Sequence, residues 1–363
     1  MTDAGSASPP FGVYCHIPFC THRCDYCAFA TWTDREHLID DYMASCRRQA
    51  RELAAELPAV TSVFFGGGTP NLVAPELLGE VLAELPLAGG AEITVECNPD
   101  LVTAEQMQSY EALGVSRISL GVQSMNAGVL DVLGRRHDPE MVAASVDAVR
   151  RAGIGQLNLD LIYGSQAESM SDWEHTLVRT IDFEPDHLSV YGLTPEAGTA
   201  LGDDPSRHPD DDDMADKYLF TDELLARAGF EAYEISNWAR PGARCRHNQL
   251  YWRQGAYAGI GCAAHSHRDG HRYWSVRTPE RFIAAISTGT SPVAGSEELD
   301  PDERRLEALQ LALRTSDGVP AGSLPHNVGH LLEPAGEGRL KLTARGRLLA
   351  NEVSVRLGLP SAR

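Results

Sequence analysis

Six short apolar runs that alternate with helical segments constrain the fold of this chain more than any other feature. The apolar runs cover residues 13–17, 60–65, 93–97, 117–122, 156–163 and 187–193. The segments with helical spacing cover residues 37–57, 75–85, 103–112, 126–134 with 139–152, and 171–182. Strands that alternate with helices indicate βαβ units and a parallel sheet. A closed eightfold barrel takes about 250 residues, so we predict an α/β fold with a partial (β/α)6 barrel at 13–200.

The rest of the chain departs from this alternation. Residues 1–12 are predicted to form a flexible N-terminus, and the aspartate-rich residues 201–213 are predicted to form an acidic surface loop. Residues 214–363 are predicted to form a smaller α+β C-terminal domain. From about residue 301, its pattern predicts helices around a short hairpin, which is similar to a winged-helix arrangement.

Composition excludes several classes of function. The 363 residues carry a net charge of −20, so the chain lacks the basic face that phosphate neutralisation needs, and we expect no nucleic-acid partner. No apolar run has membrane-spanning length, and MTDAGSASPP has no features of a secretory signal. Eight scattered cysteines favour a reducing compartment. We therefore expect a cytoplasmic protein that is not integral to a membrane.

Three cysteines follow the first apolar run in a CxxxCxxC pattern: Cys20, Cys24 and Cys27. Three thiolates can hold a [4Fe–4S] cluster and leave one iron open to the ligand atoms of a small molecule. A structural zinc site is the alternative, but it needs a fourth ligand. His22 is available for that, although the short loop makes simultaneous ligation awkward. The open iron suits an amino-acid-like cofactor, and S-adenosylmethionine fits.

Further polar residues stand where the predicted strands end, which is where α/β barrels place their chemistry. In the glycine run Gly66-Gly67-Gly68-Thr69-Pro70, backbone can approach a ligand, and N–H groups can receive a carboxylate. Glu96 and Asp160 suit ribose hydroxyls or an α-ammonium, and Arg135 suits an α-carboxylate. A tight turn or an ordinary structural role is the alternative for each. Asp160, in an apolar strand, needs a polar partner.

The late segment HNQLYW, residues 247–252, is a candidate haem site. The imidazole of His247 would suit an axial position on haem iron, and Tyr251 and Trp252 could stack on a porphyrin. A lone histidine is more often structural. His265, His267 and His271 are weaker rivals for the same role.

Several motifs occur in one order from Tyr14 to the C-terminus: YCHIPFCTHRCDYC, FFGGGTPN, VECNPD, RISLGVQS, LGRRH, NLDLIYG and HNQLYW. In this order they resemble the radical S-adenosylmethionine superfamily, and within it the HemN/HemW family of coproporphyrinogen-dehydrogenase-like proteins. The resemblance implies that Cys20, Cys24 and Cys27 ligate the cluster. It implies S-adenosylmethionine contacts at Tyr14, Tyr26, Gly67, Gly68, Thr69, Glu96, Gln123, Arg135, Asp160 and Gly192. It implies a haem motif at His247, Asn248, Tyr251 and Trp252.

Two details of the resemblance favour its haem-chaperone branch. The dehydrogenases carry a further cysteine where this chain has Phe29, and HNxxYW, a hallmark of the chaperone branch, is intact. The resemblance thus implies a chaperone that binds haem and passes it to an acceptor, with a membrane respiratory protein as one candidate. The alternative is an oxygen-independent coproporphyrinogen III dehydrogenase that uses a deoxyadenosyl radical. A zinc-bearing interaction module explains neither GGGTP nor the six-unit pattern.

Overall fold

A six-stranded parallel sheet forms the centre of the computed structural model, which describes residues 9–324 and 326–357. Its strands lie side by side in chain order and all pairs are parallel. They are β1 (Phe11–Ile17), β2 (Val60–Gly67), β3 (Leu87–Cys97), β4 (Arg117–Gln123), β5 (Gln156–Tyr163) and β6 (His187–Gly192). The predicted partial (β/α)6 barrel is confirmed. The first strand begins at Phe11, so residues 11 and 12 of the predicted flexible N-terminus belong to β1. Residues 9 and 10 precede the strand, and residues 1–8 lie outside the described residues.

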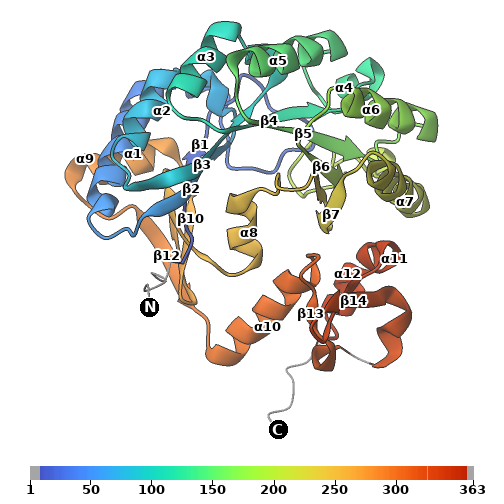
Figure 1. The fold of residues 1–363 in the computed structure, drawn as a ribbon. Helices are drawn as coiled ribbons and strands as arrows, with labels where there is room; N and C mark the ends of the chain where they lie inside the picture. Colours follow the sequence, from blue (N-terminus) through green and yellow to red (C-terminus); the bar gives the residue numbers. More distant parts are fainter. Residues whose placement is uncertain (1–8, 325, 358–363) are drawn as a thin grey trace, which may run out of the picture.

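Helices arch over the convex face of this sheet, which leaves its concave face open toward the C-terminal part of the chain (Figure 1). They are α1 (Ile39–Ala54), α2 (Pro75–Leu82), α3 (Ala104–Ala112), α4 (Ala127–Val132), α5 (Pro139–Ala152) and α6 (Met170–Asp182). Short 3-10 helices also occur, at Glu36–Leu38, Pro70–Leu72, Pro99–Leu101, Pro205–Arg207, Ala321–Ser323 and His326–Leu331.

Local sequence signals explain where these helices start and stop. The Asp138 side chain accepts a hydrogen bond from the Met141 N–H at the start of α5, and Gly153, with φ 82°, ends that helix. Ser169 and Asp172 form a reciprocal capping box at the start of α6. These caps satisfy backbone groups that the helices leave free, so the boundaries predicted from the sequence lie within a few residues of those observed.

The acidic run is only partly a loop. Asp211, Asp212 and Asp213 form the first turn of α7 (Asp211–Arg227), and the Asp210 side chain caps it by accepting from the Asp213 N–H. Negative charge at a helix N-terminus is stabilising because the helix dipole is positive there. The prediction of a loop through residue 213 was therefore wrong at its last three positions.

The sheet continues beyond the six central strands on both sides. Beside β6 lie the antiparallel strands β8 (Asn237–Ala239) and β7 (Glu231–Glu234). Beside β1 lies the parallel strand β9 (Ala256–Ile260), followed by antiparallel β10 (His265–Arg268), β11 (His271–Ser275) and β12 (Val293–Glu298). The boundary predicted at residues 201–213 thus falls inside one twelve-stranded sheet. Two helices belong to this region, α8 (Arg246–Trp252) and α9 (Pro279–Thr288).

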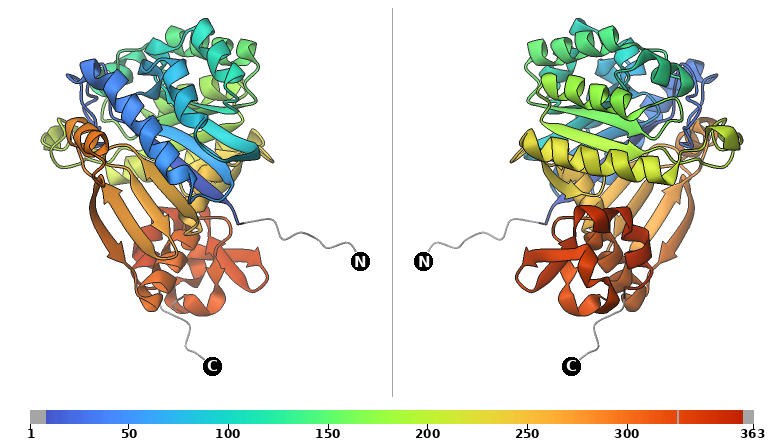
Figure 2. Two further views of the ribbon diagram at one scale, coloured as in Figure 1. Left: turned by 90° about the vertical axis from the view of Figure 1, so that its left-hand side faces the viewer. Right: turned by 90° about the vertical axis from the view of Figure 1, so that its right-hand side faces the viewer.

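A smaller unit with its own apolar core follows the sheet. It contains α10 (Pro301–Leu313), α11 (Ala344–Leu348), α12 (Ala350–Ser354) and a three-stranded sheet of β13 (Val319–Pro320), β15 (Arg339–Leu342) and β14 (Leu332–Gly336). This unit lies beneath the concave side of the large sheet (Figures 1 and 2). The helix predicted at 343–357 is broken at Leu349. Among the described residues, no helix combines the length and the apolar character needed to cross a membrane.

Candidate functional site

Two adjoining cavities open at the concave side of the sheet. The thiol cavity, of about 460 Å³, is lined by Cys20, Cys24 and Cys27 together with the ends of the central strands. The lumen cavity, of about 570 Å³, lies against the inward-facing side chains of β1 to β6 and reaches helix α8. The two cavities share six lining residues: Phe29, Gly67, Glu96, Ser119, Asp160 and Tyr191. Ligands in the two cavities would therefore lie next to each other.

The three cysteines of the motif are free, partly exposed thiols on the loop that follows β1. Burial, reinforced by the charges of the neighbouring cysteines, raises the pKa of Cys20 and Cys27 above its ordinary value. The Thr69 hydroxyl donates to the Cys20 sulfur across 3.4 Å, and Arg135 Nη1 donates to the Cys24 sulfur across 3.5 Å. Crowded thiols whose charged forms repel one another favour a bound cation or cationic cluster, which would hold all three as thiolates.

The glycine run does not form the anion cradle that the sequence suggested. The N–H groups of Gly68 and Thr69 donate to the carbonyls of Ile17 and Phe19 across 2.8 Å each, and the Gly67 N–H donates to Glu96. These donors are used inside the protein, so the expectation that they receive a ligand carboxylate was wrong in this conformation. The glycines instead permit the close approach of two chain segments.

A side chain at Gly67 or Gly68 would be strained or would clash with neighbouring atoms. A Cβ at Gly68 would lie 2.7 Å from the Ile17 and Phe19 carbonyl oxygens, and Gly67 has φ 111°. Only glycine accepts such contacts and such a φ without strain. The run thereby holds the start of the cysteine loop against β2.

The structure gathers nearly all of the predicted cofactor contacts around the thiol cavity. Its lining includes Tyr26, Gly67, Gly68, Thr69, Glu96, Gln123, Arg135, Asp160 and Gly192. Tyr14 instead lines the lumen cavity, where its hydroxyl lies 3.0 Å from His16 Nδ1. Gln123 has φ 65° at a register shift between β4 and β5, and such a shift turns a side chain away from the regular alternation of a strand.

A pair of acidic side chains forms the wall between the cavities. Burial, with a contribution from the nearby charge of Asp160, raises the pKa of Glu96 to about 7. Burial also raises the pKa of Asp160, which accepts hydrogen bonds of 2.8 Å from Ser119 and from Asn158. The partner that the sequence required for Asp160 is therefore a set of neutral donors. Two carboxylates with little compensation make this wall attractive to a cationic ligand.

Arg135 also lines the thiol cavity. Its Nη2 donates to the Asn98 side chain across 2.9 Å and to the Gly121 carbonyl across 2.8 Å. Its Nε is buried and has no hydrogen-bond partner among the described residues. With Nη1 directed at Cys24, the guanidinium places positive charge beside the thiols. That charge would stabilise a thiolate-bound cluster with net negative charge.

His247 does not have the geometry of an axial ligand. It is fully buried, its Nδ1 lies 2.9 Å from the Ser62 hydroxyl, and its Nε2 lies 2.9 Å from the Tyr251 hydroxyl. Burial lowers the pKa of His247 to about 3, so the ring is neutral. Both ring nitrogens are engaged, so the expectation that His247 presents a free lone pair to iron was wrong in this conformation.

The other residues of HNQLYW divide between two surfaces of α8. Asn248 and Tyr251 line the lumen cavity, whereas Trp252 packs edge-on against Tyr233, with ring centroids 5.6 Å apart, outside that cavity. The motif therefore contributes to the lumen through Asn248 and Tyr251, and the hydrogen bond with His247 holds Tyr251 in place. Of the rival histidines, His265 lines the lumen cavity.

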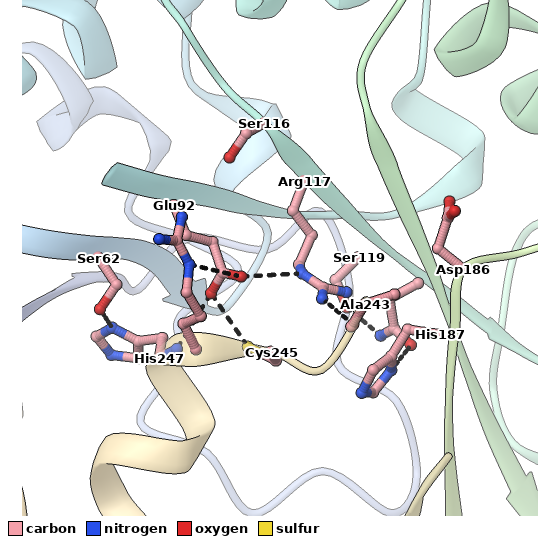
Figure 3. A network of polar contacts seen from close by, with 12 residues as sticks. Ser62, Glu92, Ser116, Arg117, Ser119, Asp186, His187, Ala243, Cys245 and His247 are labelled. Carbon is pink, nitrogen blue, oxygen red and sulfur yellow. Dashed lines mark hydrogen bonds and ion pairs between the residues drawn. The ribbon is translucent and has the colours of Figure 1, made fainter. Parts of the chain in front are cut away.

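A buried ion pair that sequence reasoning missed fixes the start of α8 (Figure 3). Arg117 Nε lies 3.7 Å from Glu92 Oε2, and both side chains are almost fully buried. Glu92 Oε1 accepts from the His247 N–H across 3.1 Å, and Arg117 Nη2 donates to the Ala243 carbonyl. A charged residue within an otherwise apolar strand indicates that a polar partner is needed, and Arg117 is such a residue. The sequence does not show that this partner includes Ala243, more than 120 residues away.

Comparison with known proteins shows which family the chain belongs to. Residues 14–179 match the family described as the radical SAM superfamily. The chain is 39% identical over 366 residues to a protein named heme chaperone HemW from Mycobacterium tuberculosis (strain CDC 1551 / Oshkosh), covering 95% of this chain and 94% of that protein. It is 40% identical over 264 residues to heme chaperone HemW of Escherichia coli (strain K12), covering 71% of this chain and 70% of that protein.

One solved structure shares the whole fold. The structure described as coproporphyrinogen III oxidase (HemN) from Escherichia coli superposes with a TM-score of 0.81, covering 96% of this chain and 89% of that one. The identity is 21%, so this likeness concerns the fold. It includes the smaller C-terminal unit as well as the barrel.

Proposed function

This chain belongs to the HemW family of the radical SAM superfamily, and from that premise we propose that it is a haem chaperone. It binds haem and transfers it to an acceptor protein, for which a membrane respiratory protein is the proposed class. The observation that carries the proposal is the 39% identity to a HemW protein, which extends over 95% of the chain and so includes α8 and the lumen cavity.

Membership of the radical SAM superfamily implies a [4Fe–4S] cluster and S-adenosylmethionine, and the thiol cavity suits both. Cys20, Cys24 and Cys27 would hold the cluster, with Arg135 as the adjacent positive charge. When bound, this pair supplies one-electron chemistry at the sulfonium. Glu96 and Asp160, on the wall shared with the lumen, are the groups that would face the cationic part of the cofactor.

The lumen cavity is the proposed haem site. Its volume of about 570 Å³ lies within the usual range of cofactor pockets, roughly 300–1,000 Å³. Aromatic side chains of Tyr14, Phe64, Tyr251 and Tyr257 provide flat apolar walls for a macrocycle. The side chain of Phe29, 64% exposed on the cysteine loop, reaches both cavities and offers a further flat surface at their common rim.

The alternative is coproporphyrinogen III dehydrogenase activity, and the shared wall of the two cavities favours it. A porphyrinogen in the lumen would lie next to the cofactor that generates the radical. Two observations weigh against it. Phe29 replaces the extra cysteine expected of the dehydrogenases, and Arg117, the arginine that lines the lumen among the described residues, is already paired with Glu92. A substrate with a propionate on every ring would need more positive charge than this.

Two measurements separate the proposals. Anaerobically reconstituted protein titrated with ferric haem should give a saturable Soret-absorbing complex, and apomyoglobin added as a generic acceptor should withdraw haem from it. Incubation with coproporphyrinogen III, a reductant and S-adenosylmethionine should give no protoporphyrinogen. Stoichiometric formation of protoporphyrinogen would replace the chaperone proposal by the enzyme.

A further inference from the structure

The haem proposal leaves open which side chain binds the iron, since His247 is engaged at both ring nitrogens. Three histidines line the lumen cavity: His16, His187 and His265. An axial ligand needs an accessible ring nitrogen with a free lone pair. The hydrogen bonds of these rings therefore decide among them.

His16 and His187 are ruled out on the same ground as His247. The ring nitrogens of His16 lie 3.0 Å from the Tyr14 hydroxyl and 2.9 Å from the Ala30 carbonyl. Those of His187 lie 2.6 Å from the Asn158 side chain and 2.6 Å from the Tyr233 hydroxyl. Both rings are at most 5% exposed. Each is a structural histidine in the wall of the barrel.

His265 differs in each respect. Its side chain is exposed, and among the described residues neither of its ring nitrogens has a hydrogen-bond partner. Its ring stacks on Trp274, with centroids 5.8 Å apart and planes inclined by 29°. Stacking fixes the ring through its face and leaves both nitrogens free. Partial burial lowers the pKa of His265, so the imidazole is in the neutral form that binds metals.

The strand register directs His265 to the cavity. Residues opposite each other in an antiparallel pair share a face, and His265 lies opposite Trp274. His267, two residues on, shares that face and lies opposite Tyr257, which lines the cavity. His267 is engaged, however, because Nδ1 lies 3.0 Å from the Gly255 carbonyl and Nε2 accepts from the Gly270 N–H.

His271 lies on the other face of the same sheet. It pairs with Arg268, which alternates with His265 and His267 along β10. It is exposed like His265, but it does not line either cavity. It is therefore a matched control for His265.

We propose that His265 is the axial ligand of the haem iron in the lumen cavity, and that His247 is a positioning residue that orients Tyr251 against the bound macrocycle. This inference rests on the proposed haem-binding function and names the ligand at that same site. Binding forms one dative bond from an imidazole nitrogen to the iron and displaces the weaker ligand that the free haem carried. No electron is transferred, and the ring stays neutral.

The test compares the ferric-haem complexes of the wild type, His265→Gly, His271→Gly and His247→Ala by optical and EPR spectroscopy. The wild type should show nitrogen ligation. His265→Gly should lose that signature and bind haem at least about tenfold more weakly, since even outer-sphere substitutions at metal sites cost that much. Added imidazole should restore the signature in His265→Gly, and His271→Gly should match the wild type. His247→Ala should keep the nitrogen signature with weakened affinity.

The outcomes distinguish the two proposals. A wild-type protein that forms no saturable haem complex would remove the haem proposal and this inference with it. Two other results would leave the haem proposal standing and overturn the assignment to His265. One is a haem spectrum that is unchanged in His265→Gly. The other is a nitrogen signature that is abolished in His247→Ala although circular dichroism shows that this variant is folded. Since the side chain of His265 is exposed on the surface of β10, its replacement should leave the fold intact.

Discussion

Gly68 lies so close to Cys20 that a methyl group on its Cα would stand 3.1 Å from the Cys20 sulfur. The same methyl group would meet the carbonyl oxygens of Ile17 and Phe19 at 2.7 Å. The glycine run and the cysteine loop are thus one rigid assembly at the ends of β1 and β2. The position of the Cys20 thiol therefore depends on the absence of a side chain at Gly68, which directly follows the neighbouring strand β2.

Replacement of Gly68 by alanine should therefore impair the cluster site more than the fold. Overpacking of this kind costs about 1–3 kcal/mol, and relief of the contacts would push the cysteine loop outward. We expect iron content after anaerobic reconstitution to fall several-fold. Gly89→Ala is the control, because a Cβ there meets nothing within 4 Å. Full iron loading of the Gly68→Ala protein would show that the loop does not need this contact.

Glu96 should make folding stability depend on pH near neutrality. Its pKa is raised from 4.5 to about 7 in the fold, so the folded state holds more protons than the unfolded state between these values. Stability should then fall as pH rises through this window, by of order 1–3 kcal/mol. Urea unfolding of the metal-free protein at pH 5 and pH 8 should show a smaller difference for Glu96→Gln than for the wild type.

The same carboxyl predicts how cofactor affinity varies with pH. A sulfonium or ammonium group near Glu96 is attracted to the charged form, so S-adenosylmethionine should bind more tightly as pH rises through about 7. Isothermal titration of the reconstituted protein should show this trend, and Glu96→Gln should weaken it. An affinity that falls with rising pH would place the cationic group elsewhere.

Arg117 and Glu92 should be energetically coupled, so that the loss of one partner costs more than the loss of both. Arg117→Met removes the buried cation beside Glu92 and leaves it with the exposed Arg246, 3.8 Å away. Breaking one partner of a buried pair costs about 3–5 kcal/mol. The double variant Glu92→Gln with Arg117→Met should recover part of that loss. The exposed pair Arg48 and Glu52, 2.9 Å apart, is the control and should contribute under about 1 kcal/mol. Denaturant unfolding measures all of these, and additive losses in the double variant would refute the coupling.

The barrel could be predicted from the sequence because its signals are local. Strand and helix periodicities, together with caps such as Asp138 and Ser169, place the central elements within a few residues. The gathering of Glu96, Gln123 and Asp160 near the cysteines also followed, because the carboxyl ends of parallel strands meet at one edge of a sheet.

The remainder depends on pairings between distant segments. The junction of β9 with β1 brings residues 256–260 beside residues 11–15, and nothing in either strand names its partner. The role of His247 was misjudged for the same reason. Its ring is satisfied by Ser62, 185 residues away, and by Tyr251, which the residue types alone could not reveal. Likewise, the glycine run was interpreted as a ligand cradle because its N–H partners are distant in sequence: Ile17 ends β1, Phe19 follows it, and Glu96 lies on β3.

The most direct test of the account is the state of the metal at Cys20, Cys24 and Cys27. Anaerobically reconstituted, reduced protein should contain a [4Fe–4S] cluster with one distinguishable iron. Electron–nuclear double resonance with S-adenosylmethionine labelled at its amino nitrogen should show that nitrogen bound to the cluster. Replacement of any one of the three cysteines by alanine should abolish the signal. Zinc at the three thiols, or a cluster whose spectrum S-adenosylmethionine leaves unchanged, would contradict the account.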